Sequence, residues 1–345
     1  MNKNKRLSVL LVGSYPLPYG GISVHVERLY KFIINSGDEC QILFTGFNQS
    51  KLIKNDGIVW IFNIVKLLKL KKTDTIVHIH VSALRNLIKI YLLSRFFKNQ
   101  SKLITIHSGT FNKKLNKQSK FKHLLLRKVL GNFNYIITVN TEQKQLLSSI
   151  LRINSDKIVV IPAFIHPISS NENFDYKNIS LIEQTYKMKI VLSGYLQDYY
   201  GYDLIIDYLE NHQKYFGFFV FYGIHDKKYK SRIINRIKNM DNAHFFTDLS
   251  PQQFNWLLKN TDMYVRNTDR DGDCVAIREA AYWGVKVCAS NSVTRPLGTE
   301  LFSFNNKFEF ENAIRNVINH PNSGKIAPGI NYANNIYEVY ESLTQ

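Results

Sequence analysis

Charged side chains that could bind a phosphorylated ligand are concentrated in residues 266–295 (RNTDRDGDCVAIREAAYWGVKVCASNSVTR). Asp271 and Glu279 have seven residues between them, and three arginines accompany them, Arg266, Arg278 and Arg295. The segment predicts a polar loop followed by a short helix from about Cys274 to Trp283. Because free amides and the helix dipole attract anions, a phosphate is expected at this helix N-terminus. The predicted amide donors are Val275, Ala276 and Ile277.

The same loop allows other interpretations. Asp269, Asp271 and Asp273 alternate as in a calcium loop, but Ala280 stands at the twelfth position, where a bidentate Glu is needed. An Asp-x-Asp pair can also hold a metal, although three residues are a weak signal. An ordinary solvated loop before a capped helix remains the third alternative. We predict no metal site.

The acid pair, the small-residue helix and the glycine after it resemble the paired-acid signature of glycosyltransferase family 4. In that family the second acid holds the ribose hydroxyls of a nucleotide-sugar donor, and the first lies beside the donor sugar. The resemblance implies these roles for Glu279 and Asp271. Family members usually have Glu at the first position, so Asp271, with its shorter arm, is a departure.

A second resemblance lies near the N-terminus. PYGGISVHVERL, residues 18–29, is similar to the first loop and helix of family 4 enzymes that act in bacterial capsule, exopolysaccharide and O-antigen synthesis. In those enzymes paired glycines, here Gly20 and Gly21, let the backbone approach the donor phosphates and the acceptor. A plain tight turn is the alternative. Residues 13–21 contain no Gly-x-Gly-x-x-Gly, so a nicotinamide-type dinucleotide site is not expected.

Three histidines fall on apolar runs. His107 ends the run in ITIHSG, at the edge where open α/β sheets bind ligands. A histidine at this place touches the donor sugar in family 4, so the resemblance implies His107 and Asp271 as catalytic residues. His78 and His80 alternate with apolar residues in IVHIHVS, and we expect them to be structural.

The strongest departure from the family is in SGYLQDYYGYDLIIDYL, residues 193–209. An Arg after the first glycine and a Lys before the next usually grip the donor diphosphate, and Tyr195 and Tyr200 occupy these positions. Tyr can donate one hydrogen bond but brings no positive charge. We expect arginines of the 266–295 segment to compensate, namely Arg266, Arg278 and Arg295.

Alternating β-rich and helical runs predict parallel sheets covered by helices on both faces. A chain of 345 residues suits two domains. With the resemblance, the expected fold is GT-B: two facing Rossmann-like α/β domains. The expected segments are an acceptor domain (1–165), a linker (166–187), a donor domain (188–325) and a C-terminal helix that crosses back to the first domain (326–345).

The net charge of +18 is unevenly distributed. Residues 1–165 contain 26 Lys and Arg against 7 Asp and Glu. Residues 75–141 contain no acidic residue, and twelve basic ones lie between Arg85 and Lys128. Such a field attracts an anionic membrane or a phosphate-rich polymer. Two helical runs, residues 84–98 and 117–130, mix these charges with Leu, Phe and Tyr, as membrane-surface helices and ordinary amphipathic helices both do. No recognised nucleic-acid-binding motif accompanies the charge, so nucleic acid ranks below the membrane.

Together these features predict a retaining, metal-independent glycosyltransferase of the hexosyltransferase type. It would use a UDP- or GDP-linked sugar, with no other cofactor, and a polyprenyl-diphosphate-linked or other anionic glycan acceptor. The alternative is a non-catalytic relative that binds a sugar nucleotide or scaffolds a polysaccharide-synthesis complex. Three cysteines without pairing or metal spacing suggest a reducing compartment. No apolar run is long enough to cross a bilayer. We therefore expect a cytoplasmic protein that associates peripherally with the inner membrane face.

Overall fold

The chain divides into two compact units in a computed structural model. The first unit contains residues 1–17, 21–165 and 331–345, and the second contains residues 18–20 and 166–330. The structure describes residues 6–16, 19–44, 58–60, 74–81, 87–107, 115–167, 182, 184–223 and 225–344. Most of the expected linker, residues 168–181 and 183, lies outside this description.

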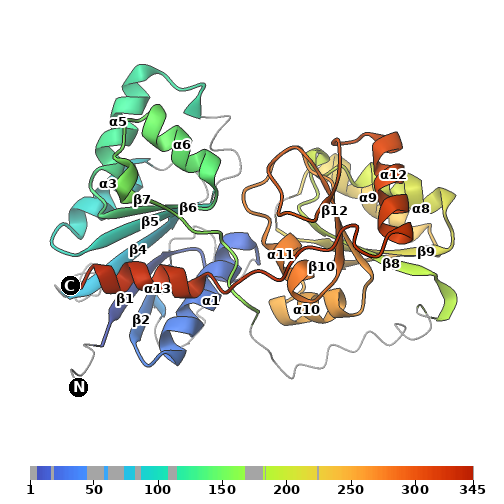
Figure 1. Cartoon of the computed structure of the whole chain (residues 1–345), viewed down its shortest axis with the longest axis horizontal. Coiled ribbons are helices and arrows are strands. Elements are labelled where there is room, and N and C mark those ends of the chain that lie inside the picture. The colour runs from blue at the N-terminus through green and yellow to red at the C-terminus, as the bar shows by residue number, and fades with distance from the viewer. Residues whose placement is uncertain are drawn as a thin grey trace. The chain divides into compact units, whose positions relative to one another are not determined.

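The first unit is built on a seven-stranded parallel sheet with the order β3-β2-β1-β4-β5-β6-β7. Its strands are β1 (Ser8–Gly13), β2 (Glu39–Phe44), β3 (Ile58–Trp60), β4 (Thr75–Val81), β5 (Lys102–Ile106), β6 (Tyr135–Thr138) and β7 (Ile158–Val160). Its helices are α1 (Gly21–Asn35), α3 (Leu87–Phe96), α5 (Lys120–Leu130), α6 (Thr141–Ser149) and α13 (Ala333–Ser342). Helices cover both faces of this sheet (Figure 1).

The second unit has a six-stranded parallel sheet with the order β10-β9-β8-β11-β12-β13. Its strands are β8 (Met188–Gly194), β9 (Tyr215–Phe221), β10 (Ala243–Thr247), β11 (Met263–Arg266), β12 (Lys286–Ser290) and β13 (Glu300–Phe302). Its helices are α8 (Tyr202–Asn211), α9 (Lys227–Lys238), α10 (Pro251–Lys259), α11 (Val275–Tyr282) and α12 (Lys307–Asn319). Figure 1 shows α8, α9 and α12 on one face of this sheet and α10 and α11 on the other.

Both sheets follow the same winding. In each, the first three strands run outward from the middle and the fourth strand returns to pair with the first, so the order reverses between β1 and β4 and again between β8 and β11. The carboxyl ends of the strands at such a reversal form the usual ligand crevice of an open α/β sheet. Each unit therefore has one predictable place for a site.

The strands form because their apolar runs are buried on both faces, as parallel sheets require. β1, β4, β5 and β9 are buried along nearly their whole length. Helix starts are fixed by side chains: Ser250 caps α10 in a capping box with Gln253, and Ser119 accepts from the Lys122 amide at the start of α5. The sequence suggested a helical run from Lys117. The helix α5 begins instead at Lys120, because the Ser119 side chain caps it there.

The last helix returns to the first unit, as the fold-class prediction required. Tyr340 of α13 is fully buried and hydrogen-bonds His78 of β4 at 2.7 Å through its hydroxyl. Tyr337 donates to Asp38, which also accepts from the Leu7 amide before β1. These contacts and the buried Ile336 fix α13 to the first sheet. The edge strands β3 and β13 are only three residues long.

Candidate functional sites at the two strand-order reversals

The reversal in the second sheet carries a buried ion network. Arg266, the last residue of β11, donates to both oxygens of Asp271 at 3.0 Å, through Nε and Nη2. Arg295 donates to Asp271 Oδ2 at 2.9 Å through Nη1. All three side chains are almost completely buried. The network contains two positive charges and one negative charge, so it carries a net positive charge at the carboxyl edge of the sheet.

Backbone carbonyls hold both guanidinium groups in place. Arg266 Nη1 donates to the carbonyl of Ser193 in β8 at 2.6 Å, and Arg295 Nε donates to the carbonyl of Ser290 in β12 at 2.9 Å. Within the described part of the chain, Arg295 Nη2 is buried without a hydrogen-bond partner. A buried guanidinium N–H without a partner is costly, and an anionic ligand would satisfy it.

The pKa of Asp271 follows from this arrangement. Burial alone would raise the pKa of the carboxyl, but the guanidinium groups of Arg266 and Arg295 lower it to about 2. Asp271 is therefore ionised at neutral pH, and both of its oxygens are engaged by arginines. It supports the arginines directly, whereas its predicted contact with the donor sugar remains a prediction.

The tyrosines at the usual phosphate-clamp positions lie beside this network. The Tyr200 ring packs under Arg266, whose guanidinium carbon is 4.7 Å from the ring centroid. A Cβ added at Gly194 would come within 2.1 Å of the Tyr200 ring, so the glycine is required by this close approach. Tyr195 contacts Tyr200 edge to face, with ring centroids 5.9 Å apart. Tyr200 thus acts as a platform for a positive charge that comes from β11.

The first turn of α11, the helix after the loop, differs from the prediction at one backbone amide. The Ile277 amide donates to the Cys274 carbonyl at 3.0 Å, so the prediction of a free amide was wrong at Ile277 because the first turn closes over it. Within the described residues, no hydrogen bond engages the amides of Val275 and Ala276. Arg278 is held by Asp273, with Nε 2.7 Å from Oδ1.

Glu279 is buried on α11 at the same edge of the second sheet. Burial and the nearby Glu279 carboxylate raise the pKa of Tyr222, whose amide donates to the Gly194 carbonyl at 3.0 Å. Gly20 belongs to the second unit. A Cβ added at Gly20 would lie 3.5 Å from Tyr195 Oη, whereas a Cβ added at Gly21 would meet nothing within 4 Å. The structure thus gathers the Asp271 network, Glu279 and Gly20 in one unit.

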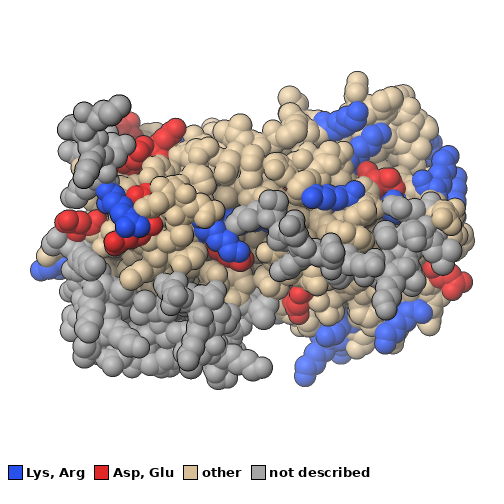
Figure 2. All heavy atoms as spheres, turned by 90° about the horizontal axis from the view of Figure 1, so that it is seen from below, with Lys and Arg blue, Asp and Glu red and all other residues tan. Residues whose placement is uncertain are grey.

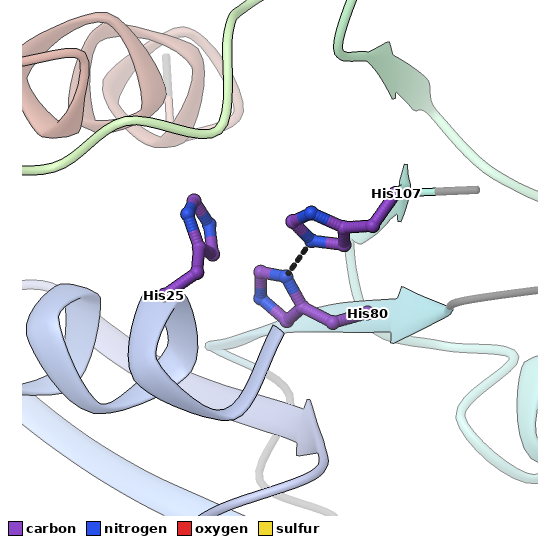
Figure 3. A group of neighbouring side chains, drawn as sticks. All are labelled: His25, His80 and His107. Carbon is purple, nitrogen blue, oxygen red and sulfur yellow. Dashed lines mark hydrogen bonds between the residues drawn. The ribbon is translucent and has the colours of Figure 1, made fainter. Parts of the chain in front are cut away.

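The reversal in the first sheet carries histidines in place of ions. Figure 3 shows His25 from α1, His80 from β4 and His107, just after β5, turned toward one another. His80 Nδ1 and His107 Nε2 are 3.2 Å apart, and one ring nitrogen of each histidine lies within 4.8 Å of the others. His78 stacks behind His80, with ring centroids 4.0 Å apart. His107 is thus separated by the unit division from Asp271, the other predicted catalytic residue.

Burial keeps these imidazoles neutral. It lowers the pKa of His25 to about 4 and that of His78 to about 3, and the pKa values of His80 and His107 lie well below the ordinary value of 6.5. Both nitrogens of His78 are satisfied at 2.7 Å, by Tyr340 Oη and Thr105 Oγ1, as expected of a structural histidine.

His25 was not among the predicted site residues, and His80 was expected to be structural only. The alternation in IVHIHVS contained the signal, since residues two apart on a strand share a face. His25, on the second turn of α1, then completes the group. Sequence spacing could not show this, because His25 and its partner Ala163 are 138 positions apart and only the fold brings them together.

The basic field of the first unit is described only in part. Arg85, Lys113 and Lys114 lie outside the described residues. Lys102 is buried, and its ammonium donates to the carbonyls of Phe97 and Gln100 at 3.1 and 2.9 Å, so it does not belong to a surface field. On the face seen in Figure 2, the coloured Lys and Arg side chains are scattered among acidic ones.

Helices α3 and α5, which pack together, carry apolar side chains on their exposed surfaces. These are Ile88 (75% exposed), Leu92 (61%), Phe121 (74%) and Leu124 (64%). Basic residues lie between them on the same helices, including Lys120 and Lys122. Within the described part of the chain, no helix is both long and apolar enough to cross a membrane.

Comparison with known proteins agrees with this two-unit arrangement. Residues 19–167 match the family model Glycosyltransferase Family 4, whereas no curated protein matches the chain. The chain is similar in structure to a glycosyltransferase from Rickettsia africae ESF-5, with 17% identity, a TM-score of 0.66 and coverage of 99% of this chain and 100% of that one.

Two further structures contain nucleotides. Anabaena HepE in complex with UDP and glucose has 13% identity and a TM-score of 0.68, covering 98% of this chain and 95% of that one. The catalytic domain of starch synthase IV from Arabidopsis thaliana, bound to ADP and acarbose, has 13% identity and a TM-score of 0.68, covering 99% and 100%. The resemblance to glycosyltransferase family 4 is thus confirmed over residues 19–167, and the whole chain has the GT-B fold.

Proposed function

We propose that this protein is a glycosyltransferase that transfers a sugar from a nucleotide-sugar donor to a glycan acceptor in bacterial surface polysaccharide synthesis. The observation that carries the proposal is the buried network of Arg266, Asp271 and Arg295 at the strand-order reversal of the second sheet. Its net positive charge and the unpartnered Arg295 Nη2 suit a diphosphate. Two structures of the same fold hold UDP and ADP, which supports a nucleotide ligand.

The network replaces the missing phosphate clamp. Tyr195 and Tyr200 supply no charge at the usual Arg and Lys positions, but Arg266 reaches the same edge from β11 and is held over the Tyr200 ring. The amides of Val275 and Ala276, which have no hydrogen-bond partner among the described residues, add donors at a helix N-terminus. Glu279 would hold the ribose hydroxyls of a UDP- or GDP-linked donor.

The proposed chemistry is a retaining, metal-independent transfer. The acceptor hydroxyl attacks the anomeric carbon from the face that the diphosphate leaves, and the departing diphosphate takes up the hydroxyl proton. Arg266 and Arg295 are already oriented by Asp271, so they stabilise the charge that develops on the leaving group without reorganising. His107 is the residue proposed to contact the donor sugar.

Calorimetry with UDP and with uridine tests the donor site. Arg295→Ala should weaken UDP binding at least tenfold, since hydrogen bonds to charged groups contribute about 1.5–3 kcal/mol, and should leave uridine affinity unchanged. Arg232→Ala is a matched control, because Arg232 is an exposed arginine of the same unit that pairs with Asp203. Equal losses for UDP and uridine would contradict the assignment. A thermal-shift screen of nucleotide sugars would identify the donor.

The absence of charge at Tyr195 and Tyr200 favours a second candidate, a non-catalytic relative that binds a sugar nucleotide or scaffolds a polysaccharide-synthesis complex. Incubation with the donor found in the screen separates the two candidates. Release of free nucleoside diphosphate, accelerated by an acceptor, supports the enzyme. Tight binding without any turnover supports the non-catalytic relative.

For the acceptor, we propose a polyprenyl-diphosphate-linked glycan at the cytoplasmic membrane face. The exposed apolar residues of α3 and α5 would enter the headgroup layer while neighbouring lysines contact anionic lipids. Co-sedimentation with anionic vesicles should be lost at high salt and reduced when Phe121 and Leu124 are both changed to Ser. Phe308→Ser is the control, since Phe308 is equally exposed (74%) on α12 of the other unit. Retention of oligonucleotides but not of vesicles would favour nucleic acid.

A further inference from the structure

We propose that His25, His80 and His107 of the first unit form a binding site for a divalent transition metal ion, for which Zn²⁺ is the best fit. The three histidines come from α1, from β4 and from the residue after β5, and they converge at the strand-order reversal (Figure 3). One ring nitrogen of each lies within 4.8 Å of the other two. The site would be separate from the arginine network of the second unit.

The tautomer of His25 provides the first argument. Its Nδ1 lies 2.8 Å from the carbonyl oxygen of Ala163, and a carbonyl can only accept, so Nδ1 carries the proton. Nε2 therefore presents a lone pair. Within the described residues this atom is buried and has no hydrogen-bond partner. A histidine that donates from one nitrogen to a backbone carbonyl and presents the other as a lone pair has the usual arrangement of a metal ligand.

The spacing of His80 and His107 provides the second argument. His80 Nδ1 and His107 Nε2 are 3.2 Å apart. Two nitrogens bound tetrahedrally to one Zn²⁺ at about 2.0–2.1 Å would lie about 3.3–3.4 Å apart. The distance between the two nitrogens would thus hardly change, although each ring would have to turn so that both lone pairs point at the ion and not at one another. The remaining distances, up to 4.8 Å, are longer than this, so metal binding would require a small inward shift of the His25 side chain.

The second nitrogen of His80, Nε2, limits the tautomers of the group but does not itself favour a metal. If His80 Nδ1 donates to His107, then Nε2 of His80 has a buried lone pair without a donor. If His107 donates, then Nε2 carries a buried N–H without an acceptor. Each tautomer leaves one polar atom of His80 unsatisfied in the metal-free protein, at the cost that burial of an unpaired polar group carries. Metal binding at Nδ1 would select the second of these tautomers, with the proton on Nε2.

The chemistry of the group selects the metal. Among the described residues, the cluster contains imidazoles and no carboxylate or thiolate. Neutral imidazole suits Zn²⁺, Cu²⁺ and Ni²⁺, whereas Mg²⁺ and Ca²⁺ require oxygen ligands. Three protein ligands leave a fourth tetrahedral position open to water. His107 would bind the ion through Nε2 and keep Nδ1 for the donor sugar, so the ion takes no part in the proposed metal-independent transfer. The nearby guanidinium of Arg28, which donates to the Ile165 carbonyl at 3.1 Å, opposes a cation, so we expect micromolar affinity.

The test uses the full chain, freed of metal by a chelator and then desalted. Equilibrium dialysis against Zn²⁺ should give one bound ion per chain, with no comparable binding of Mg²⁺ or Ca²⁺. Co²⁺ should produce the intense visible absorption of a tetrahedral site, and added Zn²⁺ should remove it. His25→Gln and His80→Gln should each weaken Zn²⁺ binding at least tenfold.

His123→Gln is the matched control. His123 lies on α5 of the same unit, away from the cluster, with Nε2 hydrogen-bonded to the Leu115 carbonyl at 2.9 Å. Circular dichroism and thermal melting establish that each variant is folded before binding is compared. Two results would overturn the proposal: absence of stoichiometric Zn²⁺ binding by the unmodified chain, or binding that survives both His25→Gln and His80→Gln in folded protein.

Discussion

The two units repeat one strand order but fill the reversal with opposite chemistry. In the first sheet the carboxyl edge between β1 and β4 holds neutral histidines, and in the second sheet the edge between β8 and β11 holds an arginine–aspartate–arginine network. Both groups are buried. The topology therefore fixes where a site lies, whereas the side chains decide whether that site is charged.

The difference also shows two solutions to the cost of burying ionisable groups. The histidines lose their charge, since burial lowers their pKa values. The ions of the second unit keep theirs, because Asp271 neutralises part of the charge and a backbone carbonyl accepts one further N–H of each arginine. Only the second solution leaves a fixed positive charge for an anionic ligand.

The largest expected effect is from removal of the carboxylate. Asp271→Ala leaves Arg266 and Arg295 buried without their counter-ion, and breaking a buried pair in this way costs about 3–5 kcal/mol of unfolding free energy. Urea denaturation measures the loss. Asp207→Ala is the control: Asp207 pairs with Arg236 at the surface, where such a pair contributes about 0–1 kcal/mol. Equal losses of unfolding free energy in the two variants would show that the ion pairs of Asp271 contribute no more to stability than a surface pair does.

The second-largest effect is expected in how the stability of the two units depends on pH. The measurement is made in the presence of a chelator. The folded-state pKa of His25 is about 4, below the ordinary value of 6.5, so the unfolded chain binds protons that the folded chain does not. Stability of the first unit should fall as the pH decreases from 6.5 to about 4. At about 1.4 kcal/mol per pKa unit, His25 alone accounts for roughly 3 kcal/mol.

The second unit should respond at lower pH. The pKa of Asp271 is reduced from 3.8 to about 2, so its contribution is complete above 3.8 and is lost as the pH falls toward 2. Hydrogen exchange of peptides covering β4 and β11, compared at pH 6.5 and 4.5, separates the units. Parallel loss of protection in both peptides would contradict the contrast.

The sequence predicted much of this fold for physical reasons that are local. Short apolar runs rich in Val, Leu or Phe, such as those in residues 8–13 and 215–221, favour buried strands, and the acid pair with its following helix predicted a ligand site in the second domain. The arginines were also predicted near the phosphate loop. Their pairing with Asp271 was not, because Arg295 is 24 positions away and reaches it only after β12 is in place.

The histidine group shows the opposite case. His80 lies on β4 and His107 directly follows the adjacent strand β5, so the sheet brings them together, but neither segment alone predicts that β4 pairs with β5. His25 depends on how α1 packs on the sheet, and its tautomer depends on the Ala163 carbonyl. Long-range packing and hydrogen-bond partners of this kind cannot be read from residue spacing.

A smaller effect is expected at Glu279. If the carboxylate of this buried residue holds the donor ribose, Glu279→Gln should weaken binding of both UDP and uridine by about 1–3 kcal/mol, since both ligands contain the ribose. Calorimetry therefore distinguishes Glu279 from Arg295, whose loss should affect UDP alone. Unchanged affinity for both ligands would remove Glu279 from the site.

The smallest effect is expected at Tyr200, and it tests whether the tyrosine supports an arginine or binds the ligand itself. The Tyr200 hydroxyl accepts from Arg266 Nη2 at 3.5 Å, the limit of a hydrogen bond, whereas the ring lies 4.7 Å from the guanidinium carbon. Tyr200→Phe keeps the ring, so unfolding free energy and UDP affinity should each change by less than about 1 kcal/mol.

Tyr200→Leu removes the ring and should cost more, because a desolvated cation–π contact contributes about 2 kcal/mol and the variant also loses aromatic packing. Urea denaturation and UDP calorimetry of the two variants give a clear decision. If Tyr200→Phe remains as stable as the unmodified chain but loses tenfold or more in UDP affinity, the hydroxyl contacts the diphosphate directly. Arg266 would then share the clamp with Tyr200, and the tyrosine would no longer be only its platform.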